Sequence, residues 1–146
     1  MSDKNLDTQI IDKKFPNQVT GNIGLYYACY ELSKKGWNVL PTSRNTKGVD
    51  IIIFDQTGTK KLTIQVKSLT KKAPVPFGSN IDHMIADFVI ICRSVLEKEP
   101  EIFIATQNEM KTTIHKGVKD GKVSYWWEPK DYEPFRNLWG KIGVGF

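Results

Sequence analysis

The sequence has few of the residues that build disulfide frameworks and zinc sites. Only two cysteines and two histidines occur among its 146 residues. Cys29 and Cys92 lie in apolar segments and lack metal-type spacing, so we expect both to be buried, reduced thiols. We therefore expect neither a disulfide-stabilised fold nor a zinc site.

Long apolar runs are also missing. The first eight residues are polar and contain no signal segment, and no later stretch approaches the length of a membrane span. We therefore expect a cytoplasmic protein with no membrane partner. The chain shows no internal repeat and no second core, and its length suits one domain. We expect a flexible lead-in over residues 1–18 and a single domain over 19–146.

Positive charge is present and is concentrated in one segment. The net charge is +5, and residues 34–72 contain nine basic residues against only Asp50 and Asp55. The rest of the chain therefore has a small acidic excess. A focused basic patch attracts polyanions and releases their counterions on contact. Nucleic acid is thus the expected partner.

Hydrophobic periodicity and turn residues predict an α/β domain with a mixed sheet covered by helices. A helix is expected over 20–35, with Thr20 as N-cap and Gly36 as the stop. We expect strands at 37–40, 49–54, 60–69, 87–92, 101–105 and 123–127, helices at 79–85, 107–115 and 132–139, and a Pro-rich loop at 73–78.

Three polar residues fall on two neighbouring strands of this sheet. Asp50 opens one strand, while Gln65 and Lys67 alternate with Leu62, Ile64 and Val66 on the next. The apolar runs 51–54 and 88–91 predict neighbouring strands that are buried on both faces. Polar side chains beside such strands need partners or a polar pit. A carboxylate, an amide oxygen and an ammonium group together suit a divalent metal held against a phosphate.

The order helix, three strands, helix, strand, with Gly48-Val49-Asp50 and Gln65-x-Lys67 at these places, resembles the PD-(D/E)xK phosphodiesterase superfamily. This group includes restriction endonucleases and Holliday-junction resolvases, besides many small bacterial and phage proteins. The likeness covers about residues 20–105. It implies a restriction-endonuclease-like three-layer fold with an αβββαβ core, and a metal-dependent DNA endonuclease that uses Mg²⁺ or Mn²⁺.

The resemblance also implies roles for individual residues. Asp50, Gln65 and Lys67 would be catalytic. Asp50, Gln65 and the carbonyl of Val66 would hold the metal, and Lys67 would orient water or stabilise charge on the phosphate. A homodimer is expected by analogy with enzymes that cut both strands.

Two residues depart from the family pattern. Gln65 is an amide where most members have a carboxylate, so this is a Gln-x-Lys variant. Leu25 stands where many related helices have a glutamate, and Glu31 is six residues further along, on another face of the helix. A site with one charged ligand would bind Mg²⁺ weakly until substrate phosphate joined it.

Loop residues beside these strands are candidates for phosphate contacts. We expect such contacts from Arg44, Lys47, Lys71 and Lys72. His83 and His115 have no spaced partner and are given no catalytic role. Three other features each have two interpretations. Gly21 and Gly24 would allow either the approach of a phosphate or close packing of the helix. The aromatic residues 125–127 would either stack on bases or belong to the core, and Phe77 would be either a wedge in a DNA groove or a dimer contact.

Three functional hypotheses follow from the sequence. The first is a metal-dependent endonuclease, the second a catalytically weak or inactive DNA-binding module on the same fold, and the third an assembly protein without nucleic-acid binding. Magnesium-dependent nicking would support the first hypothesis. Salt-dependent DNA binding without a metal requirement would support the second, and absence of any DNA binding the third.

Overall fold

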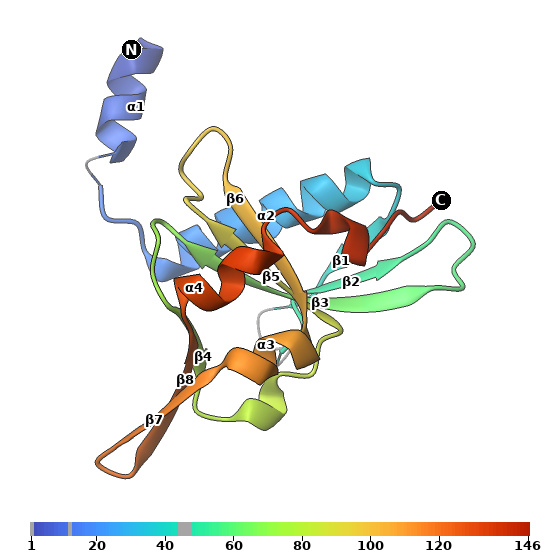
Figure 1. Cartoon of the computed structure of the whole chain (residues 1–146). Helices are drawn as coiled ribbons and strands as arrows, with labels where there is room; N and C mark the ends of the chain where they lie inside the picture. The colour runs from blue at the N-terminus through green and yellow to red at the C-terminus, as the bar shows by residue number, and fades with distance from the viewer. Residues whose placement is uncertain (1, 12, 44–47) are drawn as a thin grey trace.

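The structure is a computed structural model that describes residues 2–11, 13–43 and 48–146. Its centre is a mixed five-stranded sheet (Figure 1). Across the sheet, the strands are β1 (Asn38–Pro41), β2 (Ile51–Phe54), β3 (Lys61–Leu69), β5 (Phe88–Arg93) and β6 (Glu101–Thr106). Only β3 and β5 pair in parallel, whereas the other neighbours are antiparallel.

The helix α2 (Asn17–Lys34) covers one face of this sheet. Its buried residues Ala28 and Leu32 pack with Ile51 and Ile64 of the sheet in one apolar core. The helix begins three residues before Thr20, which was expected as its N-cap. Pro16 holds that place, because its fixed φ suits the residue where a helix begins.

The second face is covered by a smaller sheet and short helices. The smaller sheet has the order β4 (Val75–Gly78), β8 (Lys122–Trp127), β7 (His115–Lys119). The helices are α3 (Gln107–Thr113), α4 (Pro129–Tyr132) and the 3-10 turns η1 (Ile81–His83) and η2 (Glu133–Phe135). Buried side chains of this layer, among them Trp127 and Tyr132, form a second apolar core with β5 and β6. The 3-10 turn η3 (Trp139–Lys141) packs instead against the core on the α2 side. The expected three-layer α/β architecture is thus confirmed.

Residues 1–18 were expected to form a flexible lead-in, but Asp3–Ile11 form the helix α1. Figure 1 shows α1 projecting away from the layered body, next to the start of α2. Leu6 and Ile10 on this helix are exposed. Among the described residues, no helix has the length and apolar character needed to span a membrane.

Several expected elements differ from those observed. The Pro-rich loop contains the strand β4, where Pro76 is tolerated because β4 lies at the edge of its sheet. The strand β7 replaces the end of the helix expected over 107–115. The helix expected over 79–85 is the turn η1. The helix expected over 132–139 is divided between α4, η2 and η3, since Pro134 and the left-handed backbone of Asn137 interrupt it.

Burial on both faces was predicted for two strands and is found in one. All residues from Val89 to Arg93 in β5 are buried. In β2, however, Ile52 is 37% exposed, because the layer opposite α2 does not extend over the β1–β2 side of the sheet. The burial that surrounds β3 therefore comes mainly from β5.

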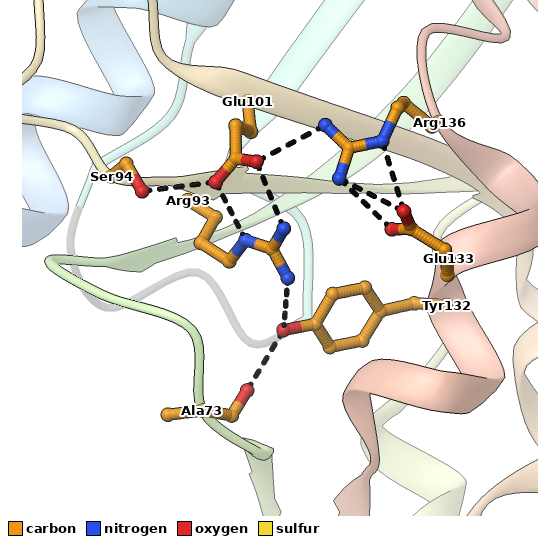
Figure 2. A network of polar contacts seen from close by, with 7 residues as sticks. All are labelled: Ala73, Arg93, Ser94, Glu101, Tyr132, Glu133 and Arg136. Atoms are coloured by element: carbon orange, nitrogen blue, oxygen red, sulfur yellow. Dashed lines mark hydrogen bonds and ion pairs between the residues drawn. The ribbon is translucent and has the colours of Figure 1, made fainter.

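A polar network joins the second layer to the loop that follows β3 (Figure 2). Arg93, which is buried, donates two hydrogen bonds to Glu101, at 2.8 and 2.9 Å, and one to the hydroxyl of Tyr132. That hydroxyl donates in turn to the carbonyl of Ala73 at 2.9 Å. The hydrogen bonds from Arg93 lower the pKa of Glu101 to about 2. The network thus anchors the segment between β3 and β4 to the body of the domain.

The helix α2 approaches β3 unusually closely at Gly24. A β-carbon at this position would lie 1.9 Å from Oγ of Ser68 and 2.9 Å from its Cβ. This confirms the close-packing reading of Gly24. Because the helix is held so near the strand at this point, the following residue, Leu25, is brought against the start of β2.

We predict that Gly24→Ala lowers the free energy of unfolding by about 1–3 kcal/mol, because an added methyl group must push α2 away from β3. Gly21→Ala is the matched control, since a β-carbon there meets nothing within 4 Å. It should stabilise the protein by about 0.5–1 kcal/mol through helix propensity alone. Urea unfolding of both variants measures the difference, and equal stability of the two would contradict the close approach.

Candidate active site

Asp50 lies immediately before β2 and is fixed to β3 at two points. Its backbone N–H donates to the carbonyl of Ile64 at 2.9 Å, and its Oδ2 accepts from the N–H of Val66 at 2.7 Å. These contacts lie on either side of Gln65 in the strand. Gly48 makes the turn into this position with a φ of +72°, and a β-carbon there would lie 2.1 Å from the carbonyl oxygen of His83. Backbone geometry therefore requires the glycine at position 48, in addition to any need for the carboxylate at position 50.

A cavity of about 220 Å³ opens beside Asp50. Leu25 from α2, Thr42 after β1 and Val66 of β3 also line it. The second carboxylate oxygen of Asp50, Oδ1, has no hydrogen bond to any residue that the structure describes. The leucine thus occupies the place from which a helix carboxylate would reach the same cavity. Glu31 is committed elsewhere, to ion pairs with Lys34 and Lys35.

The polar residues of β3 alternate as the sequence predicts. Leu62, Ile64 and Val66 pack in the core beneath α2. Lys67 is directed to the opposite layer, with its ammonium nitrogen 5.2 Å from the centre of the Phe77 ring. Within the described parts of the chain, no ion pair joins Lys67 to a carboxylate. Its charge is therefore not neutralised by direct contact.

Gln65 has a partner that the sequence did not reveal. Its Oε1 accepts a 3.3 Å hydrogen bond from Nε2 of Gln107, the first residue of α3. Gln107 is 6% exposed, and its own Oε1 is buried without a hydrogen-bond partner. A capping box between Thr106 and Glu109 fixes the start of α3, so the position of Gln107 is rigidly set. A residue far along the chain thereby controls the direction of the Gln65 amide.

Asp50 and Lys67 are charges of opposite sign in a poorly solvated place. Burial raises the pKa of the Asp50 carboxyl, and the N–H of Val66 and the charge of Lys67 offset this only in part. Burial likewise lowers the pKa of the Lys67 ammonium group, and the negative charge of Asp50 offsets part of that shift. Both groups therefore lack compensation that a bound cation and a bound anion would supply.

Asp50, Gln65 and Val66 carry oxygen atoms of the kinds that a hard divalent cation prefers, and only one of the three groups is charged. Oδ1 of Asp50 accepts no hydrogen bond from the described residues, and the amide oxygen of Gln65 accepts one, from Gln107. Asp50 and Val66 line the cavity described above, whereas Gln65 does not. No group of three or more His, Cys, Asp or Glu side chains that could hold a metal occurs among the described residues. Such a set suits Mg²⁺ or Mn²⁺, which retain several waters, and does not suit zinc.

The other sequence candidates have varied positions. Lys71 and Lys72 are exposed on the loop after β3, whereas Arg44 and Lys47 lie outside the described residues. Phe77 is buried beneath Lys67, so it is neither a groove wedge nor a dimer contact. His83 lies 3.3 Å from the amide of Asn80, and His115 pairs with Asp131 at 2.9 Å.

Sequence reasoning missed Gln107 as a neighbour of Gln65. The two residues are 42 positions apart, and their contact depends on the parallel pairing of β3 with β5 and on the start of α3. The Thr106-x-x-Glu109 capping signature marks the helix start, but nothing in the sequence indicates that the next side chain turns inward. The interpretation of residues 125–127 as part of the core agrees better with the structure, since Trp127 is fully buried.

Comparison with solved structures identifies nucleases of the same fold. The chain is similar to Hjc, a Holliday junction resolvase from the archaeal hyperthermophile Archaeoglobus fulgidus, with 15% identity, a TM-score of 0.59, and coverage of 86% of this chain and 98% of Hjc. It is also similar to the bacterial homing endonuclease I-Ssp6803I, with 17% identity, a TM-score of 0.56, and coverage of 87% and 92%. No protein-family model and no curated protein matches the sequence. The fold is thus restriction-endonuclease-like.

The coupling between the two buried charges predicts an unusual lysine titration. In protein whose lysines are ¹³C-methylated, the NMR signal of Lys67 should titrate below the ordinary lysine value of about 10.4. Asp50→Asn should lower this midpoint further, because the negative charge that favours the ammonium form is removed. An unchanged Lys67 midpoint in Asp50→Asn would show that the two groups are not coupled.

Proposed function

We propose that the chain is a metal-dependent DNA endonuclease that hydrolyses phosphodiester bonds. The observation that carries this proposal is the pair of Asp50 and Lys67, two partly buried charges that influence each other without forming an ion pair, each of which lines a cavity of its own. Leaving opposite charges unpaired in a desolvated place is unfavourable unless ligands complete them. A divalent cation at Asp50 and a phosphate at Lys67 are the complementary ligands.

Each residue has a defined part in this proposal. Asp50, Gln65 and the Val66 carbonyl would hold Mg²⁺ or Mn²⁺, which when bound supplies Lewis-acid activation of water and of the phosphate. The hydrogen bond from Val66 fixes Oδ2 of Asp50, so Oδ1 would be the oxygen that meets the metal. Lys67 would stabilise negative charge that develops on the phosphate, and its poor solvation strengthens that interaction.

The fold supports DNA as the substrate class, since both similar structures are nucleases and one of them is named for the Holliday junctions that it resolves. Lys71 and Lys72 follow β3 directly, and the hydrogen bond from Tyr132 to Ala73 anchors their loop. They would therefore contact phosphates on either side of the reacting one. Arg44 and Lys47 are proposed for the same task on sequence grounds. A homodimer and a cytoplasmic location also remain proposals.

A second candidate function is a DNA-binding module with weak or absent catalysis. Two observations favour it over a full nuclease. Leu25 supplies no oxygen to the cavity beside Asp50, and the amide oxygen of Gln65 already accepts a hydrogen bond from Gln107. A metal would thus meet one charged ligand and an amide that is partly committed, so its affinity would depend on bound substrate.

Nicking of supercoiled plasmid in Mg²⁺ or Mn²⁺ tests the two candidates. We expect metal-dependent nicking that falls by at least about 100-fold in Asp50→Ala and in Lys67→Ala, because each removes a group that acts on the reacting phosphate. Asp55→Asn and Lys61→Ala are controls of matched residue type at the far end of β3. They should retain wild-type activity.

Equal nicking by the Asp50 and Lys67 variants would contradict the nuclease proposal. If the wild-type chain is inactive but binds DNA without metal, the Leu25→Glu/Gln65→Glu variant is the next test. It shows whether the site lacks only charged metal ligands or is not a nuclease site at all. Gain of metal-dependent nicking by this variant would assign the chain to the second candidate. A chain that binds no DNA at low salt would be an assembly protein on this fold.

A further inference from the structure

The start of α2 has unsatisfied hydrogen-bonding capacity. No side chain caps this helix, Pro16 at the N-cap has no N–H to donate, and the first turn contains no acidic residue. The N–H groups of Val19 and Thr20 donate to the carbonyl of Pro16, so those of Asn17 and Gln18 are the donors that remain at the positive end of the helix dipole. In a helix of 18 residues this end favours an anion. A helix end alone does not define a site, but here other features converge on it.

Thr20 provides the first of these features. The residue is only 8% exposed, and its hydroxyl makes no hydrogen bond to any residue that the structure describes. It lines two cavities at the start of α2, of about 490 and 310 Å³. The hydroxyl is not among the fully buried polar atoms, so it can donate to a group that enters the cavity.

The two cavities form one groove that leads to Lys67. They share the lining residues Asn17, Thr20, Ser68 and Leu69, so they adjoin along the contact between α2 and the end of β3. The inner cavity reaches Lys67, and the outer cavity is lined by Lys13, Lys14 and Lys71. Among the described residues, no carboxylate lines either part. Figure 1 shows the chain entering this region from α1, which projects beyond it.

Among the described residues, the charges along the groove have one sign. Lys13, Lys14 and Lys71 are exposed, and in the portion of the chain that the structure covers none of them forms an ion pair. An elongated groove with amide and hydroxyl donors inside and ammonium groups at its outer end suits a chain of phosphates better than a single compact anion.

We propose that this groove binds the sugar-phosphate backbone of the nucleic-acid strand on one side of the phosphate that meets Lys67. One phosphate lies at the start of α2, where the free N–H groups and the Thr20 hydroxyl donate to it, and the next is held between Lys13, Lys14 and Lys71. The proposal rests on the proposed function for the identity of the phosphate at Lys67. It adds the segment before α2 to the substrate-binding surface.

Anisotropy of labelled duplex and single-stranded DNA, measured without metal over a range of salt, tests the groove. Lys13→Gln/Lys14→Gln should weaken binding at least about tenfold and reduce the slope of log Kd against log salt by roughly one to two, since each lost phosphate contact removes about 0.7–0.9. Thr20→Val keeps the shape of the side chain. It should weaken binding by about threefold to tenfold with the slope unchanged, because an uncharged donor is lost.

Lys60→Gln/Lys61→Gln is the matched control, with the same change in charge on exposed residues at the other end of β3. It should alter the affinity and the salt slope far less than the groove variant. Equal effects of the two double variants, together with unchanged binding by Thr20→Val, would overturn the proposal. Melting temperatures of all variants identify any effect that comes from unfolding.

Inorganic phosphate separates a strand site from a free-anion site. Phosphate compared with chloride at matched ionic strength should displace DNA weakly and equally from the wild type and from Thr20→Val. Strong displacement from the wild type that is lost in Thr20→Val would assign a free-phosphate site and overturn the strand proposal. Failure of the proposed function gives a different result: the wild type would show no metal-dependent cleavage, while these differences in DNA binding would persist.

Discussion

The central feature of the structure is a carboxylate and an ammonium group that lie near each other, poorly solvated, without forming an ion pair. Asp50 is fixed by the N–H of Val66, and Lys67 extends over the ring of Phe77. Burial shifts the pKa values of both groups toward their neutral forms. A direct ion pair would relieve this cost, yet none forms. We propose that ligands complete this arrangement, a cation on one side and a phosphate on the other.

Backbone packing creates this arrangement. Gly48 allows the chain to turn sharply into Asp50, and Gly24 allows α2 to lie directly on β3. The same close approach has two further effects. It brings Leu25 to the cavity beside Asp50, where the side chain adds no ligand, and it leaves a groove between the start of α2 and the end of β3. In the proposed function, metal affinity and the path of the substrate would thus both depend on the contact of one helix with one strand.

Much of the fold could be predicted from the sequence because its signals are local. The alternation of Leu62, Ile64 and Val66 with Gln65 and Lys67 indicates both a strand and the sides of its residues, and the structure agrees. The strand β4 was missed because proline is a poor signal for any strand except at an edge. Exposure of Ile52 was missed because periodicity cannot show how far a covering layer extends.

The site was predicted less completely because it depends on contacts between distant segments. The strand order in the sequence indicated that Asp50 and Lys67 lie near each other, and in the structure their charges influence each other. The contact of Gln107 with Gln65 and the groove beside Thr20 require the tertiary structure, since no local pattern distinguishes these residues from ordinary helix starts. The same contact explains how an amide can serve at this place in β3. A donor from α3 fixes its direction, as outer partners do for metal ligands elsewhere.

Anomalous scattering from crystals soaked in Mn²⁺ tests the central claim most directly. A site that is completed by a cation predicts one manganese peak, bounded by the Asp50 carboxylate, the amide oxygen of Gln65 and the carbonyl of Val66. Absence of a peak at saturating Mn²⁺, with Asp50 still bound only to the N–H of Val66, would contradict it. In that case the two buried charges would be a structural feature of the sheet and not a metal-binding catalytic site.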